Sequence, residues 1–332
     1  MEGVSQVEPT RRTSDDWFEL RGPDGAPIRF VERRRRGRRR GDRPRVDVLP
    51  ALNEPTPTVS LVIPTRNEAR NVANVLEHLP GIVTEVVLVD GLSWDVTKLM
   101  ARSSRPSVRI VDVPQPGKGN ALRSGFAAAT GDIVVAMDAD GSMSPDEIPR
   151  FVHPLQHGFD FTKGSRFMAG GGSLDITPTR RLGNHALVSL VNALFHVRYT
   201  DLCYGFFAFK RVFLEPLGLR STGFEIETEV TLRAQIMGLR IAEVPSVELP
   251  RRTGHSGLHA TNDGMRILRT IRQQYDSVRA NSAGPTAPTD PPDGTGLRTS
   301  PNEKRDGPLV QQSERVRHRR LPTSGNGRPL GA

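Results

Sequence analysis

The sequence predicts an α/β protein with a mostly parallel central sheet and helices on both faces. Short apolar runs alternate with amphipathic stretches between residues 59 and 137. Short apolar runs between turn residues are typical of buried strands, whereas apolar residues at helical spacing are typical of amphipathic helices. Polar or glycine-rich residues follow each apolar run. Because strands that alternate with helices form parallel sheets, these observations together favour this fold class.

The expected elements follow one another along the chain. We expect strands at 59–63, 85–89, 108–113 and 133–137, a helix that opens at 65–70, and another at 121–129. Ser144 and Pro145 mark a further helix start, because both residue types are favoured at the first positions of helices. In the second half we expect a strand that ends near 167, helices at 182–195, from 223 onward and at 263–275, and a strand at 239–249.

The charge is concentrated at the two ends of the chain. Of the formal net charge of +9 in 332 residues, residues 1–50 carry +4, from 13 Arg against 9 acidic residues, and residues 281–332 carry +3, from 8 basic against 5 acidic residues. The central part is therefore close to neutral. We expect a disordered Arg-rich tail at 1–57, one catalytic-size domain at 58–280 and a disordered basic tail at 281–332, because neither tail shows a strand or helix period.

The sequence also bears on the compartment. The single cysteine, Cys203, excludes an intramolecular disulfide framework and a zinc site built from several cysteines. No apolar segment reaches the ~20 residues that cross a bilayer, and no secretory signal opens the chain. We expect a cytoplasmic protein. The arginine run at 33–40 suggests peripheral contact with the inner face of the membrane, and a solvated tail is the alternative.

Two aspartates, Asp138 and Asp140, follow the strand expected at 133–137. Alternate residues of an extended chain point the same way, so both carboxylates can reach one hard cation. Ligands of open α/β sheets bind at the carboxyl ends of strands, which is where this pair falls. The pattern indicates a site for Mg²⁺ or Mn²⁺ that holds a diphosphate. A solvated turn before Gly141 and Ser142 is the alternative.

Loops after the other strands carry residues suited to a nucleotide. Asn67, Glu68 and Asp90 have side chains that can hydrogen-bond a base or a ribose. The Gly-Lys-Gly at 117–119 allows close backbone approach to phosphates beside a cation. It lacks the spacing of a P-loop, and the first loop lacks Gly-x-Gly-x-x-Gly. The sequence therefore supports neither a P-loop NTPase nor a dinucleotide oxidoreductase.

Four of these segments form an ordered set of motifs. They are Val-Ser-Leu-Val-Ile-Pro-Thr-Arg-Asn-Glu at 59–68, Val-Asp-Gly-Leu-Ser-Trp-Asp-Val-Thr at 89–97, Gly-Lys-Gly at 117–119 and Asp-Ala-Asp-Gly at 138–141. The set resembles family 2 glycosyltransferases of the GT-A fold, and most of all the branch with dolichol-phosphate mannosyltransferase and bacterial polyprenyl-phosphate glycosyltransferases. The resemblance covers residues 58–272.

The resemblance implies an inverting, divalent-metal-dependent enzyme that moves a sugar from a GDP- or UDP-sugar to an acceptor, with a polyprenyl phosphate as the favoured acceptor. It implies that Asp138 and Asp140 hold Mg²⁺ or Mn²⁺. It also implies donor contacts from nine residues: Pro64, Thr65, Asn67, Glu68, Asp90, Gly117, Lys118, Gly119 and Asp138.

The second half extends the resemblance to the acceptor side. Arg166 ends an expected strand, Arg181 precedes the helix at 182–195, and Arg251 and Ser256 lie in a loop similar to Arg-x-x-Gly-x-Ser-Lys-Leu. The resemblance implies that these four residues contact an acceptor phosphate, which arginines bind through charge-assisted hydrogen bonds. For Arg181 a solvated surface arginine is the alternative.

The residues implied to be catalytic are Asp140, Arg166, Glu227 and Glu229. Glu227 and Glu229 match a Glu-x-Glu element at a helix start, where acidic residues also stabilise the helix dipole. A phosphate acceptor is already anionic and needs no strong base. A hydroxyl acceptor must lose its proton to Glu227 or Glu229. The set of arginines favours phosphate.

Four positions depart from the usual pattern of the family, and two of them bear on contacts. Phe207 stands where a polar residue is frequent, and Gly257 stands where a lysine is usual, so one contact and one cation are expected to be missing. The other two departures are Gly91 and Val96.

Two other functions compete with this one. A soluble glycosyltransferase that acts on a hydroxyl of a polysaccharide or small metabolite would differ only in its acceptor. A non-catalytic nucleic-acid-binding protein would fit the pI of 10.5. Because the centre is near neutral and the basic residues are not interleaved with stacking aromatics, we expect no nucleic-acid partner.

Overall fold

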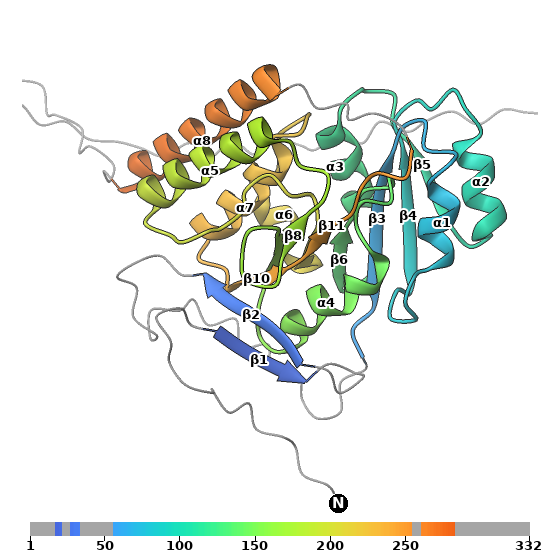
Figure 1. The fold of residues 1–332 in the computed structure, drawn as a ribbon, viewed down its shortest axis with the longest axis horizontal. Coiled ribbons are helices and arrows are strands. Elements are labelled where there is room, and N and C mark those ends of the chain that lie inside the picture. Colours follow the sequence, from blue (N-terminus) through green and yellow to red (C-terminus); the bar gives the residue numbers. More distant parts are fainter. Residues whose placement is uncertain (1–16, 22–26, 34–55, 254–259, 283–332) are drawn as a thin grey trace, which may run out of the picture. The chain divides into compact units, whose positions relative to one another are not determined.

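Nine strands form one central sheet (Figure 1). The computed structural model describes residues 17–21, 27–33, 56–253 and 260–282, which belong to one compact unit, Met1–Gly284. Within these residues the strand order is β1, β2, β10, β7, β9, β6, β3, β4, β5. In that order the strands are Trp17–Arg21, Pro27–Arg33, Ile241–Pro245, Phe161–Ser165, Phe207–Lys210, Ile133–Ala136, Val59–Thr65, Glu85–Asp90 and Arg109–Asp112.

Seven of these nine strands run in one direction, as their pairings require. β3 pairs in parallel with β4 and β6, β4 with β5, and β7 with β10. β9 is antiparallel to β6 and β7, and β2 is antiparallel to β1 and β10. The prediction of a mostly parallel central sheet is confirmed, and four of the expected strands become β3, β4, β5 and β6.

Helices cover both faces of the sheet, as expected (Figure 1). The helices are α1 Val72–Glu77, α2 Thr97–Ser104, α3 Lys118–Ala128, α4 Ile148–Gln156, α5 Pro178–Phe195, α6 Leu214–Leu217, α7 Ile226–Ile236 and α8 Ala260–Ser282. One buried cluster contains side chains of α1, α2 and α4, and the other contains side chains of α3, α5, α6, α7 and α8. β3 contributes side chains to both clusters, because Leu61 and Ile63 belong to the first and Val62 to the second.

Several short elements complete the described fold. Single 3₁₀ turns at Pro145–Glu147 and Arg211–Phe213 precede α4 and α6. The strand expected at 239–249 is interrupted after Pro245, and Val247–Glu248 forms β11 instead, which pairs with β8 at Gly172–Ser173. α2 was not predicted, because only Thr97 and Ala101 of its residues are buried and the apolar pattern is correspondingly weak.

The helix expected to open at 65–70 begins later, at Val72. Asn67 adopts a left-handed backbone conformation with φ 60°, which ends the strand and turns the chain. The Asn67 N–H donates to the Ser93 hydroxyl at 2.9 Å, and its side-chain oxygen accepts from the Trp94 N–H at 3.0 Å. Residues 66–71 therefore form a loop that is tied to the loop after β4.

The prediction of disorder at the amino terminus is wrong for β1 and β2. Ile28 and Phe30 of β2 are buried in the first cluster, and the Phe30 ring packs edge-on against Phe159 at 5.0 Å. Arg33, the first residue of the arginine run, is also buried, and its Nε donates to Glu243 at 2.7 Å. The alternation in residues 27–31, in which apolar Ile28 and Phe30 flank polar Arg29, was the available strand signal.

The other predictions for the tails lie outside the described residues. This holds for residues 1–16, 22–26, 34–55 and 283–332, and for the loop at 254–259 that contains Ser256 and Gly257. α8 runs to Ser282, beyond the end expected for its helix. Among the helices that the structure describes, none combines the length and the apolar character that a bilayer span requires.

Candidate active site

A cavity of about 320 Å³ lies where β3, β4 and β6 end. This is the edge of an open α/β sheet at which ligands bind. Six of the nine expected donor residues line it, together with Asp140 and Arg251 of the other predicted sets. The full lining is Pro64, Thr65, Arg66, Glu68, Gly91, Gly117, Lys118, Ala121, Asp138, Ala139, Asp140, Phe224 and Arg251.

A three-residue ion cluster lies at this cavity. Lys118 begins α3, Asp138 follows β6, and Glu227 lies in the first turn of α7. The Lys118 ammonium is 2.7 Å from Asp138 Oδ1 and 2.6 Å from Glu227 Oε1. Gly205 lies against the cluster, because a Cβ there would stand 2.7 Å from the Lys118 ammonium and 2.8 Å from Glu227 Oε1. The structure thus brings Glu227 together with two of the expected donor residues.

The cluster keeps Lys118 charged. Burial alone would lower the pKa of this ammonium, but the negative charges of Asp138 and Glu227 outweigh burial and raise the pKa above its ordinary value. Lys118 is therefore a fixed cation at neutral pH, suited to neutralise a phosphate and unsuited to act as a base.

Gly117 and Gly119 are required by contacts with the protein itself. A Cβ on Gly117, whose φ is +119°, would stand 2.1 Å from the Thr222 carbonyl oxygen, and a Cβ on Gly119 would stand 2.4 Å from that of Ser221. Loop 221–222 therefore packs where we expected phosphate to approach. Only Gly117 of the two lines the cavity.

Asp140 is held from two sides. Its Oδ1 accepts from the Ser142 N–H at 3.0 Å and hydroxyl at 2.7 Å, while Oδ2 forms an ion pair with Arg251 at 2.9 Å. Nearby, burial raises the pKa of Glu68, the hydrogen bond from Asn71 opposes this, and the charges of Asp140 and Asp138 raise it further. Arg251, which we expected to contact the acceptor, therefore pairs with Asp140, the carboxylate that we expected to bind metal.

The carboxylates of the cavity suit a divalent cation. Glu68, Asp138 and Asp140 line the cavity with Arg66, Lys118 and Arg251, and Glu227 adds a fourth carboxylate through its pair with Lys118. Carboxylate oxygens are the ligands that Mg²⁺ and Mn²⁺ prefer. Asp138 and Asp140 could hold such an ion with oxygens of a bound ligand in the remaining positions.

Asp90 and Asn67 lie beside the cavity but do not line it. Asp90 is buried, and its Oδ2 accepts from the Ser93 N–H at 3.0 Å. Its Oδ1 is buried with no hydrogen-bond partner among the described residues. A buried carboxylate oxygen without a donor is costly, so this atom can still accept a hydrogen bond. Asn67, by contrast, uses its side chain to hold the Trp94 backbone.

Arg166 is buried and fully engaged within the protein. Asp201 accepts from its Nε at 2.8 Å and its Nη2 at 3.1 Å, Glu248 accepts from Nη1 at 3.2 Å, and the Cys203 carbonyl accepts from Nη2 at 3.0 Å. Its guanidinium also stacks over the Tyr204 ring at 4.9 Å. These contacts engage all three nitrogens of the guanidinium, so Arg166 positions its surroundings in this conformation.

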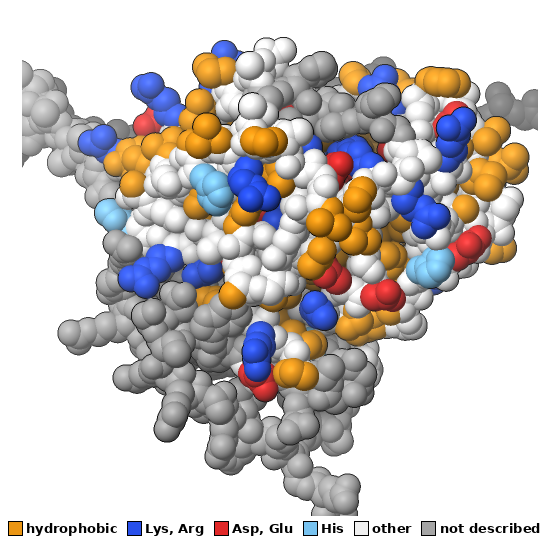
Figure 2. All heavy atoms as spheres, in the orientation of Figure 1, with side chains coloured by type: hydrophobic (Ala, Val, Ile, Leu, Met, Phe, Trp, Pro, Cys, Tyr) orange, Lys and Arg blue, Asp and Glu red, His pale blue; other side chains and the backbone are white. Residues whose placement is uncertain are grey.

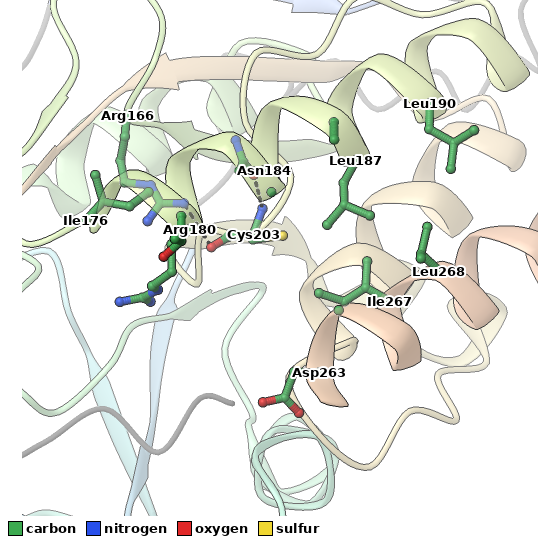
Figure 3. A pocket seen from close by; sticks show the side chains of 14 residues that line it. Arg166, Ile176, Arg180, Asn184, Leu187, Leu190, Cys203, Asp263, Ile267 and Leu268 are labelled. Carbon is green, nitrogen blue, oxygen red and sulfur yellow. Dashed lines mark hydrogen bonds between the residues drawn. The ribbon is translucent and has the colours of Figure 1, made fainter. Parts of the chain in front are cut away.

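The neighbouring arginines differ from the expectation. Arg181 is exposed, with its guanidinium 5.9 Å from the Phe167 ring centre. Arg180, one residue earlier, lines an apolar groove with Arg166, and Figure 3 shows both at the same end of it. The helical rotation between adjacent residues, about 100°, explains why only one of the pair faces the groove. Ser256, the fourth expected acceptor residue, lies outside the described residues.

The groove has a volume of about 430 Å³ and runs between α5 and α8. Leu187 and Leu190 of α5 lie across from Ile267 and Leu268 of α8, away from the arginines (Figure 3). Burial raises the pKa of the Cys203 thiol, which also lines the groove, to about 12, so the thiol is neutral. Hydrophobic side chains also gather on the surface in this region (Figure 2), among them Leu182, Leu190, Met265 and Leu268.

Glu229 is not brought into the cavity. Its carboxylate accepts from the Ser221 N–H at 2.7 Å and from the Arg220 N–H, and it pairs with Arg233 at 2.9 Å. Glu227 and Glu229 are two residues apart on a helix and therefore point in different directions. The two acids of the Glu-x-Glu element therefore lie in different surroundings, and Glu229 binds loop 220–221.

The four positions that depart from the usual pattern of the family lie in different parts of the chain. Phe207 is buried in the sheet against Phe126 and Phe161, so its side chain does not face the cavity. Gly91 lines the cavity, Val96 is 55% exposed, and Gly257 lies outside the described residues.

Among the lining residues that were not predicted, two have aromatic or charged side chains. Phe224 lies with its ring centre 5.8 Å from the Lys118 ammonium, and Arg66 lies in the first loop. The signals available in the sequence were an aromatic residue directly before the acidic helix start and an arginine between Thr65 and Asn67.

The comparisons with known proteins agree with this geometry. The model of glycosyl transferase family 2 matches residues 60–218. The chain is 31% identical to dolichol-phosphate mannosyltransferase of Pyrococcus furiosus over 65% of its own length and 62% of the relative's. It is 29% identical to undecaprenyl-phosphate mannosyltransferase of Micrococcus luteus over 67% of its own length and 98% of the relative's.

A solved structure shows the same fold. Glucosyl-3-phosphoglycerate synthase of Mycobacterium tuberculosis, crystallised with Mn²⁺, UDP and its product, aligns with a TM-score of 0.53 at 24% identity, over 66% of this chain and 80% of the other. The fold of this chain is therefore the GT-A fold. The chain is also 30% identical to glycosyltransferase AglJ of Haloferax volcanii over 63% of its own length and 70% of the relative's, and it belongs to glycosyltransferase family 2.

Proposed function

We propose that this enzyme transfers a sugar, with inversion, from a nucleotide diphosphate to a polyprenyl phosphate. The observation that carries the proposal is the proximity of two unlike cavities, one charged and one apolar. Arg251 of the charged cavity pairs with Asp175 at 3.6 Å, next to Ile176 of the apolar groove, and the segment from Cys203 to Gly205 adjoins both. A charged donor and a lipid acceptor need such an arrangement.

The donor side is proposed to bind a GDP- or UDP-sugar. The unpartnered Oδ1 of Asp90 supports contact with the base, because guanine and uracil both offer ring N–H donors. Lys118 supports a position for the diphosphate, since its ammonium lines the cavity and remains charged. As the bond to the sugar breaks, negative charge grows on the leaving diphosphate, and Lys118 would stabilise it.

Asp138 and Asp140 are proposed to hold Mg²⁺ or Mn²⁺. The position of both carboxylates in the lining of one cavity supports this assignment, and the solved structure of the same fold was crystallised with Mn²⁺ and UDP. A bound divalent ion would supply positive charge to the diphosphate. Before it binds, Lys118 and Arg251 pair with these two carboxylates.

The acceptor is proposed to lie in the groove between α5 and α8, with its phosphate towards Arg180 and its chain along the leucines. A phosphate is a nucleophile without loss of a proton. This agrees with the engagement of Glu229 by loop 220–221 and of Glu227 by Lys118. The exposed apolar side chains of α5 and α8 support peripheral contact with a membrane surface, from which a polyprenyl chain would enter.

Calorimetric titration of GDP and UDP into the full chain, with and without Mn²⁺, tests the donor site. We expect metal-dependent binding of one nucleotide that is lost in Asp140→Asn. Asp146→Asn is the matched control, because Asp146 is exposed and lies outside the cavity. Equal binding by wild type and Asp140→Asn would contradict the assignment of Asp140.

A further inference from the structure

A second polar cavity, of about 660 Å³, lies apart from both cavities described above. Its walls come from loop 220–222, from the start and middle of α7, and from one face of α8. Its α8 residues differ from those of the apolar groove, so the two cavities lie on different faces of the helix. The lining is Arg220, Ser221, Thr222, Glu225, Glu229, Arg233, Arg266, Arg269, Thr270, Gln273, Gln274 and Ser277.

Two of its four arginines are neutralised within the protein. Arg266 donates from Nε to Glu225 at 2.9 Å and from Nη2 at 2.8 Å, and Arg233 pairs with Glu229 at 2.9 Å. Both carboxylates also accept backbone N–H groups, Glu225 from Gly223 and Glu229 from loop 220–221. Most acceptor positions of the Glu225 and Glu229 carboxylates are therefore occupied, so these two acids do not compensate the other cations of the cavity.

Arg220 and Arg269 are not neutralised in this way. Among the described residues, no carboxylate forms an ion pair with either of them. Arg266 and Arg269 are three residues apart on α8, a spacing at which like charges repel. The cavity thus carries two uncompensated positive charges, and hydroxyl and amide donors from Thr270, Gln273 and other side chains surround them.

We propose that this cavity, whose uncompensated cations are Arg220 and Arg269, binds a phosphate-bearing anion. Phosphate oxygens accept forked hydrogen bonds from guanidinium groups, and hydroxyl and amide donors complete their coordination. The volume is sufficient for a ligand the size of a diphosphate or a nucleotide. The phosphate belongs either to a free metabolite or to a lipid headgroup, since α8 also borders the groove proposed for the acceptor.

The cavity is separable from the donor site. The backbone of Ser221 and Thr222 forms part of its wall and packs on the other side against Gly117 and Gly119. Lys118→Gln therefore removes one of the three cations that line the donor cavity and leaves the residues of the arginine cavity unchanged. Further variants compared with this parent test the proposal whether or not the donor assignment holds.

The test is titration of inorganic diphosphate into the full chain without divalent metal, by calorimetry. We expect Lys118→Gln to retain one binding event and the triple variant Lys118→Gln/Arg220→Gln/Arg269→Gln to bind about tenfold more weakly or not at all. The matched control adds Arg272→Gln to Lys118→Gln, because Arg272 lies on α8 with its side chain 85% exposed and outside the cavity. This control is expected to bind like Lys118→Gln.

Flotation with vesicles distinguishes the two sources of phosphate. Vesicles of phosphatidic acid in phosphatidylcholine are compared with vesicles of phosphatidylcholine alone. The site is supported if the triple variant loses diphosphate binding, phosphatidate-dependent flotation, or both. Which of the two is lost identifies the source of the phosphate. Equal diphosphate binding and equal flotation by the triple variant and its Lys118→Gln parent would overturn the proposal, since any anion binding would then occur elsewhere on the chain.

Discussion

Lys118 joins the donor loop to two acidic residues that come from distant parts of the chain. Its contacts with Asp138 and Glu227 are short, and Gly205 leaves the space in which the three groups meet. The Gly-Lys-Gly pattern predicted a cation near phosphate but gave no sign of its ion partners. Residues 109 positions apart in the sequence, Lys118 and Glu227, meet only because α3 and α7 pack against the same face of the sheet.

Gly205→Ala is expected to disturb this cluster. The new methyl group would stand under 3.0 Å from Lys118 and Glu227, so the ion pairs must rearrange. We expect nucleotide affinity to fall about tenfold in calorimetric titration, which corresponds to ~1.4 kcal/mol. Gly81→Ala is the control, because a Cβ at Gly81 meets no atom within 4 Å. Unchanged affinity in Gly205→Ala would show that the cluster does not contribute to donor binding.

Glu229→Gln is expected to affect stability more than catalysis. Glu229 is buried and accepts two backbone N–H groups of loop 220–221. Loss of its charge weakens those bonds and the pair with Arg233, so the free energy of unfolding should fall by about 1–3 kcal/mol in urea titration. The transfer rate per folded molecule should remain within about twofold of wild type. A large loss of rate with unchanged stability would restore Glu229 as a catalytic residue.

At the scale of elements, the amino-terminal hairpin extends the sheet beyond the region that matches the family model. β2 pairs with β10, and Arg33 of β2 binds Glu243, which in turn accepts the N–H groups of Thr200 and Asp201. The hairpin thus supports the segment that holds Arg166.

Phe30→Ala tests whether β2 belongs to the folded core. Phe30 is 1% exposed and packs against Phe159, so the free energy of unfolding should fall by about 3–5 kcal/mol. Arg29→Ala, on the opposite face of the same strand, should change it by less than about 1 kcal/mol, because the Arg29 pair with Glu19 is exposed. Urea unfolding measures both. Equal stabilities would mean that β2 does not pack as described.

The sequence predicted the four parallel strands from β3 to β6 because each contains a short apolar run, which is buried on both faces in β3, β4 and β6 and half-buried in the edge strand β5. It did not predict the antiparallel β9, since its pairing with β6 and β7 is a long-range property without a local signal. At the site, the residues at strand ends lie together because topology gathers them. The contacts of Arg166 with Asp201 and of Glu229 with loop 220–221 were not predicted, because they depend on tertiary packing.

At the scale of the whole molecule, acid is expected to destabilise the fold. Hydrogen bonds from Thr58 lower the pKa of Asp132, and burial would raise the pKa of Asp201 but Arg166 outweighs it and lowers that pKa. Such carboxyls bind fewer protons when folded than when unfolded, so their stabilisation is complete above the unfolded pKa and is lost as the pH falls through the folded pKa. Glu147, whose burial raises its pKa, acts in the opposite sense.

Urea unfolding should therefore show a lower midpoint at about pH 3 than at about pH 6. Asp132→Asn removes one of the carboxyls that are responsible, so the difference between the two midpoints should become smaller. An unchanged difference would show that Asp132 does not take part in the acid transition.

The most direct test of the central claim is transfer of labelled sugar from GDP- and UDP-sugars to polyprenyl phosphate in detergent micelles. We expect label in the organic phase only when polyprenyl phosphate and a divalent metal are both present, and none with Asp140→Asn. Transfer to hydroxyl acceptors such as sugars or oligosaccharides, with none to polyprenyl phosphate, would contradict the account and favour a glycosyltransferase with a water-soluble acceptor.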